Sequence, residues 1–321
     1  MSDAIFAGVL AVSYLSKLIG KDRYNRMLDC VSGQAAFKIA QEANFGQGAT
    51  DLKTASDNET NALVDLIKNQ CPFVGLKEYF LSRYDFFNAE ALIKSKYLKF
   101  DSSNMTNSLG LIDVNKLAQW IKEDDYDQLH PSLKTALENA DTMFVEKNAD
   151  GFLVNNLFIK AYYDYLKQKI KMSLLKEALI KKIDYVNLIA AFRADGDENL
   201  IEEMFIGGGK LKLERIKEIA HKGYDYIKNE FVIDETHEFL KKIFADAKEG
   251  RPLVLSENES DSFLLKRLKE DRFDLDNEKQ FLLYCLYKQN EITNVNIIVV
   301  GIESGLDKTQ INARLRECYE N

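Results

Sequence analysis

Three acidic side chains in this sequence are each followed, three residues later, by an asparagine. The pairs are Asp85 with Asn88, Asp184 with Asn187, and Glu291 with Asn294. An acid and an amide at this spacing lie on neighbouring positions of one helical face, where the carboxylate could act as a catalyst or bind an ion. Apolar residues surround each pair, and buried polar groups are normally hydrogen-bonded. We therefore expect the pairs to tie neighbouring helices together and fix their register.

The pairs belong to a longer repeat. An apolar run follows each of them, and Gly110 and Gly209 stand at the same distance behind Asn88 and Asn187. A glycine followed closely by an acid also precedes an apolar helical pattern near residues 20 and 305. We expect each glycine to close one helix in a left-handed turn and the acid to begin the next helix. The sequence predicts three helical repeats, over residues 1–109, 110–208 and 209–321.

The composition predicts a mostly helical globular protein. The chain of 321 residues contains 3 prolines, 46% hydrophobic residues and 29% charged residues, which suits helices with an ample core. The stretch 297–302 is rich in β-branched residues that favour strands, but its alignment with the two other copies favours a helix. Ser56 and Glu59 predict a capping box before a helix over residues 62–69.

Charge and cysteine usage exclude several classes of protein. The net charge of −8 argues against a nucleic-acid binder, because such proteins cluster Lys and Arg. Four scattered cysteines predict no disulfide framework or zinc site and suit a cytosolic compartment. The apolar run 4–15 is too short to span a bilayer, and Asp3 stands where a signal peptide carries positive charge. Contact with a membrane is therefore expected to go through a partner.

Two motifs for ligand binding are incomplete. The run 207–210 resembles a phosphate-binding loop, but Met204 and Leu211 occupy the positions of a required Gly and a required Ser or Thr. An acidic stretch over residues 195–199 resembles the start of a calcium loop, but Leu200 and Ile206 replace its Gly and Glu. The three histidines have no spacing typical of ligands. We expect no cofactor, no metal and no catalytic site.

One run of the sequence is enriched in lysine within this acidic chain. Most such runs are solvated helix faces, but this one could also dock an acidic partner surface. The lysines are Lys167, Lys169, Lys171, Lys176, Lys181 and Lys182.

Taken together, the three helical units with their acid and Asn signature, the stretch 291–301 and the Gly-to-helix boundaries resemble one family over nearly the whole chain. This family comprises the C subunits of the V/A-type ATPases, which are related to the d subunit of eukaryotic vacuolar ATPases. The resemblance implies three similar helical-bundle domains around a pseudo-threefold axis, forming a funnel. It also implies a peripheral protein on the cytoplasmic face of the membrane.

The resemblance further implies a non-catalytic rotor connector that joins the central stalk subunits to the membrane rotor ring. It would transmit torque for coupled ATP hydrolysis or synthesis and proton or sodium transport. Two alternatives remain at this point. A helical scaffold unrelated to ATPases would share the composition, and a helical hydrolase would need Asp85, Asp184 or Glu291 in one cleft.

Overall fold

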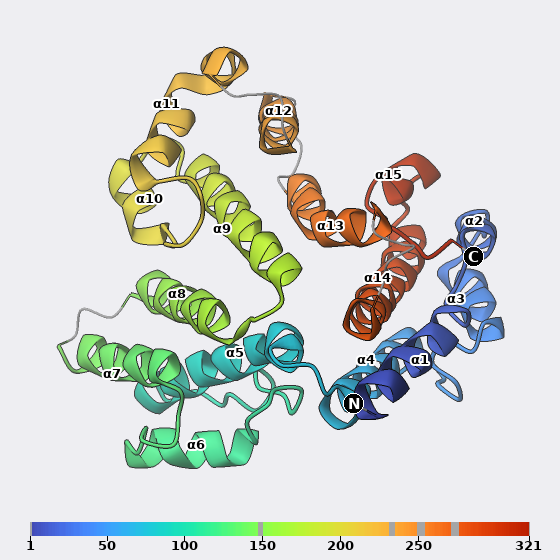
Figure 1. Ribbon diagram of the computed structural model, residues 1–321, viewed down its shortest axis with the longest axis horizontal. Helices are drawn as coiled ribbons and strands as arrows, with labels where there is room; N and C mark the ends of the chain where they lie inside the picture. The colour runs from blue at the N-terminus through green and yellow to red at the C-terminus, as the bar shows by residue number, and fades with distance from the viewer. Residues whose placement is uncertain (1, 147–149, 231–234, 249–253, 271–275, 321) are drawn as a thin grey trace. The chain divides into compact units, whose positions relative to one another are not determined.

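The computed structural model describes residues 2–146, 150–230, 235–248, 254–270 and 276–320. Within these ranges the chain is helical and has no strand, which confirms the predicted all-α class. Figure 1 shows the helices in chain order. They are α1 (Ser2–Leu15), α2 (Lys21–Leu28), α3 (Gly33–Glu42), α4 (Leu52–Gln70), α5 (Leu76–Leu98), α6 (Val114–Glu123), α7 (Pro131–Val145), α8 (Gly151–Lys169), α9 (Ser173–Arg193), α10 (Glu198–Met204), α11 (Leu213–Glu230), α12 (Glu235–Lys248), α13 (Val254–Glu270), α14 (Asn277–Glu303) and α15 (Lys308–Asn312).

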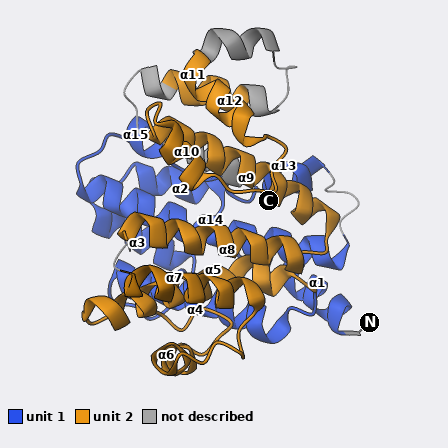
Figure 2. Ribbon diagram, turned by 90° about the vertical axis from the view of Figure 1, so that its left-hand side faces the viewer, with its two compact units in different colours: residues 1–73, 261–321 blue, residues 74–260 orange. Residues whose placement is uncertain are grey.

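The chain forms two compact units, coloured separately in Figure 2. The first unit combines the two ends of the chain, residues 1–73 and 261–321, and the second comprises residues 74–260. In the first unit, helices α1, α3 and α4 pack against the long helix α14. The two ends of the sequence therefore share one hydrophobic core, which includes Met27, Phe37 and Val295.

Two hydrophobic clusters lie within the described residues of the second unit. One is built by α5 to α8 around residues such as Leu117 and Phe158, and the other by α9 to α12 around Leu188 and Phe239. The core around α5 combines residues from before and after position 109, where the first predicted repeat ends. The three repeats with boundaries at 109/110 and 208/209 stay a prediction.

The stretch 297–302 lies inside the 27-residue helix α14. Ile298 and Val299 are buried there, at 0% and 2% exposure. Packing of this face against the core outweighs the preference of β-branched residues for strands. The prediction of a helix is confirmed.

The predicted capping box at Ser56 and Glu59 is wrong. Helix α4 begins earlier, at Leu52, because the carboxylate of Asp51 accepts a hydrogen bond of 2.8 Å from the backbone N–H of Thr54. Such a cap satisfies an N–H that has no partner within the helix. Glu59 therefore lies in the helix interior, where it is free to make a tertiary contact.

No helix within the described ranges is long and apolar enough to cross a membrane.

Candidate functional site

The acid and the amide of the first pair bind the backbone of the loop that follows α5. Asp85 accepts hydrogen bonds of 3.1 and 2.9 Å from the backbone N–H groups of Leu111 and Ile112. The side-chain amide of Asn88 donates to the carbonyl of Asn107 at 2.8 Å and accepts from its N–H at 3.0 Å. Both side chains are buried, at 3% and 0% exposure. The pair thus fixes the path of the chain between α5 and α6.

The second pair makes the same contacts at the same sequence distances. Asp184 accepts from the N–H groups of Lys210 and Leu211 at 3.1 and 2.9 Å. Asn187 donates to the carbonyl of Ile206 and accepts from its N–H, both at 2.8 Å. Burial raises the pKa of Asp184 above its ordinary value, while the two N–H groups and nearby lysines act in the opposite direction. This carboxylate is therefore buried at an electrostatic cost that its backbone donors partly offset.

The third pair differs because its acid binds a segment from the other end of the chain. Asn294 repeats the two-way contact with a backbone amide, donating to Arg316 at 2.9 Å and accepting from it at 2.7 Å. Glu291 instead accepts a hydrogen bond of 2.6 Å from the N–H of Ile19, 272 residues away in the sequence. Ile19 precedes Gly20 and α2. The N-terminal segment thus takes the place that a following loop takes in the first two pairs.

Glycines at four helix boundaries were predicted to adopt left-handed turns: Gly20, Gly110, Gly209 and Gly305. The prediction is confirmed only at Gly305, where φ is +73°. Gly20 has a φ of −82°, and Gly110 and Gly209 are not among the residues with positive φ. A Cβ added at Gly110 or Gly209 would lie 2.1 Å from a carboxylate oxygen of Asp85 or Asp184, respectively. These two positions therefore require glycine because a buried acid lies against the backbone.

A largely buried ion cluster surrounds Glu291 at the wall of a cavity. The ammonium of Lys288 lies between the carboxylates of Glu291 and Glu59, at 2.6 Å from that of Glu59. The three side chains are 13%, 5% and 15% exposed, in the order Lys288, Glu291, Glu59. Glu59 also accepts a hydrogen bond of 2.6 Å from the N–H of Gly46. Burial lowers the pKa of Lys288, but the two carboxylates outweigh it and hold this pKa above its ordinary value.

This cluster lines a cavity of about 1090 Å³ in the first unit, between the end of α1, the start of α2, α4 and α14. The walls carry both positive and negative side chains, and Glu291 is the only acid of the three motif pairs that lines it. The sequence did not predict a site that contains Glu59 or Lys288. The spacing of Lys288 and Glu291 on one helical face could have indicated an ion pair, but no local signal connects them to Glu59.

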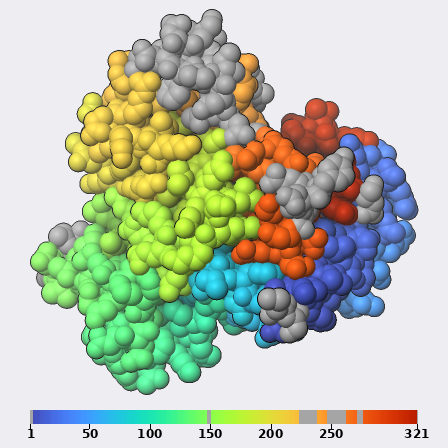
Figure 3. All heavy atoms as spheres, viewed as in Figure 1, coloured from blue at the N-terminus to red at the C-terminus, as the bar shows by residue number. Residues whose placement is uncertain are grey.

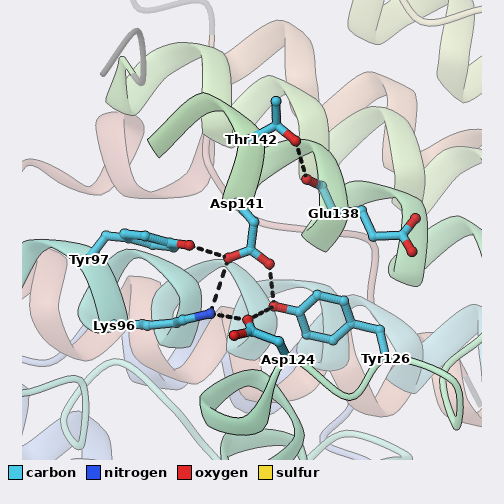
Figure 4. A network of polar contacts seen from close by, with 7 residues as sticks. All are labelled: Lys96, Tyr97, Asp124, Tyr126, Glu138, Asp141 and Thr142. Carbon is cyan, nitrogen blue, oxygen red and sulfur yellow. Dashed lines mark hydrogen bonds and ion pairs between the residues drawn. The ribbon is translucent and has the colours of Figure 1, made fainter. Parts of the chain in front are cut away.

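A second polar network lies among α5, α6 and α7 (Figure 4). Lys96 pairs with Asp124 and, at 3.2 Å, with Asp141. The hydroxyls of Tyr97 and Tyr126 donate to Asp141 at 2.7 and 2.5 Å. Burial is the main cause that raises the pKa of both tyrosines, and their contacts with Asp141 raise it further. One ammonium and two phenol hydroxyls bind the two carboxylates of this network, which thereby connects three helices.

The stretches that resembled ligand-binding motifs have structural roles. Asp197 caps α10 by accepting from the N–H groups of Asn199 and Leu200. The carbonyl of Gly207 accepts a hydrogen bond of 2.8 Å from Lys167. Among the side chains that the structure describes, no group of three His, Cys, Asp or Glu residues could hold a metal ion.

The predicted docking lysines are partly engaged within the chain. Lys167 pairs with Asp164 at 2.6 Å, and the ammonium of Lys169 lies 5.6 Å from the ring centre of Tyr165. Lys171 and Lys176 are exposed. The yellow-green segment that carries these lysines forms part of the face in view in Figure 3. Their role in docking stays a prediction.

Replacing Asn187 with aspartate should destabilise the protein. The amide now donates to one backbone group and accepts from another, whereas a carboxylate can only accept, and would face the carbonyl of Ile206. We expect Asn187→Asp to lower the free energy of unfolding by about 2–3 kcal/mol. Urea unfolding followed by circular dichroism measures this. Asn199→Asp, at an exposed position, is the control and should leave the unfolding midpoint unchanged.

The three pairs hold helices to neighbouring chain segments, which is a structural role. Comparison with known proteins gives the family of the chain. Residues 11–314 match the family described as ATP synthase (C/AC39) subunit. The chain is 22% identical to the C subunit of the A-type ATP synthase of Methanosarcina mazei, covering 94% of this chain and 89% of that protein. It is 24% identical to the C subunit of the A-type ATP synthase of Halorubrum lacusprofundi, covering 93% of each chain. Since the family match spans nearly the whole sequence, this chain belongs to the ATP synthase (C/AC39) subunit family.

Proposed function

We propose that this protein is the non-catalytic rotor connector of a V/A-type rotary ATPase. It joins the central stalk subunits to the membrane rotor ring and transmits torque for coupled ATP hydrolysis or synthesis and proton or sodium transport. The observation that carries the proposal is the family match over residues 11–314. Both relatives are named as subunits of an A-type ATP synthase, and we extend that assembly to this chain.

Torque transmission requires stiffness, and the buried pairs supply a physical basis for it. Each pair fixes a helix to a chain segment through a charge-assisted hydrogen bond and a two-way amide contact, at Asp85, Asp184 and Glu291. Charge-assisted hydrogen bonds are among the stronger polar contacts in proteins. We propose that the three pairs mark three similar helical domains around a pseudo-threefold axis, which together form a funnel.

The environment of the acids also supports a non-catalytic role. Asp85, Asp184 and Glu291 are 3%, 5% and 4% exposed, and each accepts hydrogen bonds from backbone N–H groups. A general base needs access to a substrate proton. The oxygens of Asp85 and Asp184 are held by the backbone away from the cavity, and only Glu291 of the three acids lines it. A hydrolase that needs these acids in one cleft is therefore disfavoured.

The proposal places the protein on the cytoplasmic face of the membrane as a peripheral component, in contact with the bilayer only through the ring. We propose that the lysine run that extends from the end of α8 into α9, from Lys167 to Lys182, then faces an acidic surface of a stalk subunit. Electrostatic complementarity of this kind chiefly sets the rate and the specificity of association.

Deletion of the gene should uncouple the ATPase. Without the connector, the head can still hydrolyse ATP, but the torque does not reach the ring. We expect membranes from the deletion strain to lose ATP-driven ion transport, and the tagged wild-type protein to copurify with the stalk subunits in a stoichiometric complex. Ion uptake into membrane vesicles, measured beside ATP hydrolysis, tests this. Normal coupling in the deletion strain would overturn the proposal.

A helical scaffold unrelated to ATPases is the alternative from the sequence, and a pull-down separates the two. The scaffold would show no affinity for stalk or ring subunits. No specific contact among the described residues favours it.

A further inference from the structure

The cavity of the first unit follows the axis of helix α4. It is lined by Glu59, Leu63, Leu66 and Gln70, whose spacing of four, three and four residues places them on one face of that helix. At 1.5 Å per residue, this face extends over about 16 Å. The cavity is therefore elongated and suits an extended ligand better than a compact ion.

The walls of the cavity carry an excess of negative charge. Among the described residues, six acidic and four basic side chains line it. Lys288 lies between the carboxylates of Glu59 and Glu291, so this largely buried end keeps one negative charge. Asp65, farther along α4, is exposed and has no ion pair within the described part of the chain. Negative charge is thus spread along the cavity, where it attracts cations.

One hydroxyl at the cavity wall has no hydrogen-bond partner. Tyr284 is 8% exposed and lines the cavity. Its hydroxyl is not enclosed by protein atoms and makes no hydrogen bond with a described residue. Burial, and after it the nearby Cys285, Glu291 and Glu59, raise the pKa of this hydroxyl, which is therefore neutral and close to both carboxylates. Because buried polar groups are normally hydrogen-bonded, the Tyr284 hydroxyl is poised to accept a hydrogen bond from a bound cation.

Aromatic rings form another part of the wall. The ring centres of Tyr14 and Tyr284 lie 5.5 Å apart, and Phe45 lines the same cavity. The ammonium of Lys17 lies 4.9 Å from the ring centre of Tyr14, and that of Lys288 lies 5.8 Å from the ring centre of Phe45. Ammonium groups on methylene chains already pack against these rings, because a cation is attracted to an aromatic face. A ligand with the same two features can make the same contacts.

We propose that this cavity binds a linear polyamine, with one ammonium beside Glu59, Glu291 and the Tyr284 hydroxyl and another toward Asp65. The methylene chain of the ligand then lies along the leucine side chains of α4. A metal ion fits less well, because no group of three His, Cys, Asp or Glu among the described side chains could hold one. An anion fits less well, because two carboxylates share the buried end of the cavity with a single ammonium.

The test is a titration of spermidine into the full-length protein, followed by isothermal titration calorimetry at constant ionic strength. We expect one binding site, and we expect Tyr284→Phe to weaken the affinity about tenfold, because it removes a hydrogen bond to a charged group. Tyr162→Phe is the matched control. The hydroxyl of Tyr162 also has no hydrogen-bond partner among the described residues, but Tyr162 does not line the cavity. This variant should bind like the wild type, and without spermidine both variants should keep the wild-type melting temperature.

A second pair of variants separates this site from general attraction to an acidic protein. Asp65→Asn should weaken spermidine binding about threefold, because it removes a charge from the cavity. Asp57→Asn removes an exposed charge of α4 outside the cavity and should leave binding unchanged. A wild type that does not bind spermidine, or equal affinities of Tyr284→Phe and Tyr162→Phe, would overturn the inference. Binding of inorganic phosphate in place of spermidine would overturn it too, by assigning the cavity to anions. All titrations use the isolated chain, so these outcomes are independent of the proposed role in an ATPase.

Discussion

Gly209→Ala is expected to lower the free energy of unfolding by about 2–4 kcal/mol, and Gly110→Ala by a similar amount. The new methyl group would lie 2.1 Å from the carboxylate of Asp184 or Asp85, which is well inside van der Waals contact. The carboxylate cannot move away without losing the backbone N–H groups that it binds in the core. Each variant must therefore either strain the loop or leave a buried charge without its donors.

Gly20→Ala is the matched control. Gly20 likewise stands next to a residue whose N–H binds a motif acid, because Ile19 binds Glu291, but nothing lies within 4 Å of a Cβ added at Gly20. Its φ of −82° is accessible to alanine. We expect a loss of only about 1 kcal/mol, which arises because alanine is a poorer N-cap than glycine. Urea unfolding of the full-length variants measures all three effects, and equal effects would contradict the argument.

A double substitution identifies the cause of the effect. If the clash with the carboxylate is responsible, Gly209→Ala should cost less in an Asp184→Ala background than in the wild type. If the backbone of Gly209 were responsible, the cost would be the same in both backgrounds.

The repeat made much of this site predictable from the sequence. Asp184 and Gly209 recur at the offset of Asp85 and Gly110, and an offset is preserved when two positions must meet. The offset could therefore have indicated that the acid and the glycine meet, but we interpreted it only as a sign of repetition. We expected a left-handed turn at these glycines, whereas the structure shows a close approach by an acid. Both requirements select glycine, so residue type alone cannot distinguish them.

The contacts of the third pair could not be predicted in this way. Glu291 binds Ile19 across 272 positions, and Glu59 reaches Lys288 from a different helix. Neither contact has a local spacing, because tertiary packing of the two chain ends brings the groups together. The misplaced capping box has a local cause instead. Glu59 fits the pattern of a cap, but Asp51 already begins the helix, and the cluster in the core uses the Glu59 carboxylate instead.

Lys288→Met is expected to have the largest effect on stability, a loss of about 3–5 kcal/mol in the free energy of unfolding. Methionine fills much of the same volume but leaves the carboxylates of Glu59 and Glu291 buried side by side without a cation. Their remaining donors are the N–H groups of Gly46 and Ile19, which do not neutralise two negative charges. Removing one partner of a buried ion pair costs far more than the pair contributes to stability, because the other charge stays in the core.

The control for this substitution is Lys53→Met, which breaks an ion pair with Asp57 on the surface of the same unit. Exposed pairs contribute little to stability, so the unfolding midpoint of Lys53→Met should match that of the wild type.

Unfolding is measured at neutral pH, because the carboxylates hold the pKa of Lys288 above its ordinary value. The stabilisation by Lys288 is then complete, and it is lost only as the pH rises through that raised pKa. Adding Glu59→Gln to Lys288→Met should recover part of the loss, since one buried charge is then removed. If Lys288→Met and Lys53→Met had equal effects, the three groups could not form a desolvated cluster, and the N-terminal segment would have to be held on α14 by apolar packing alone.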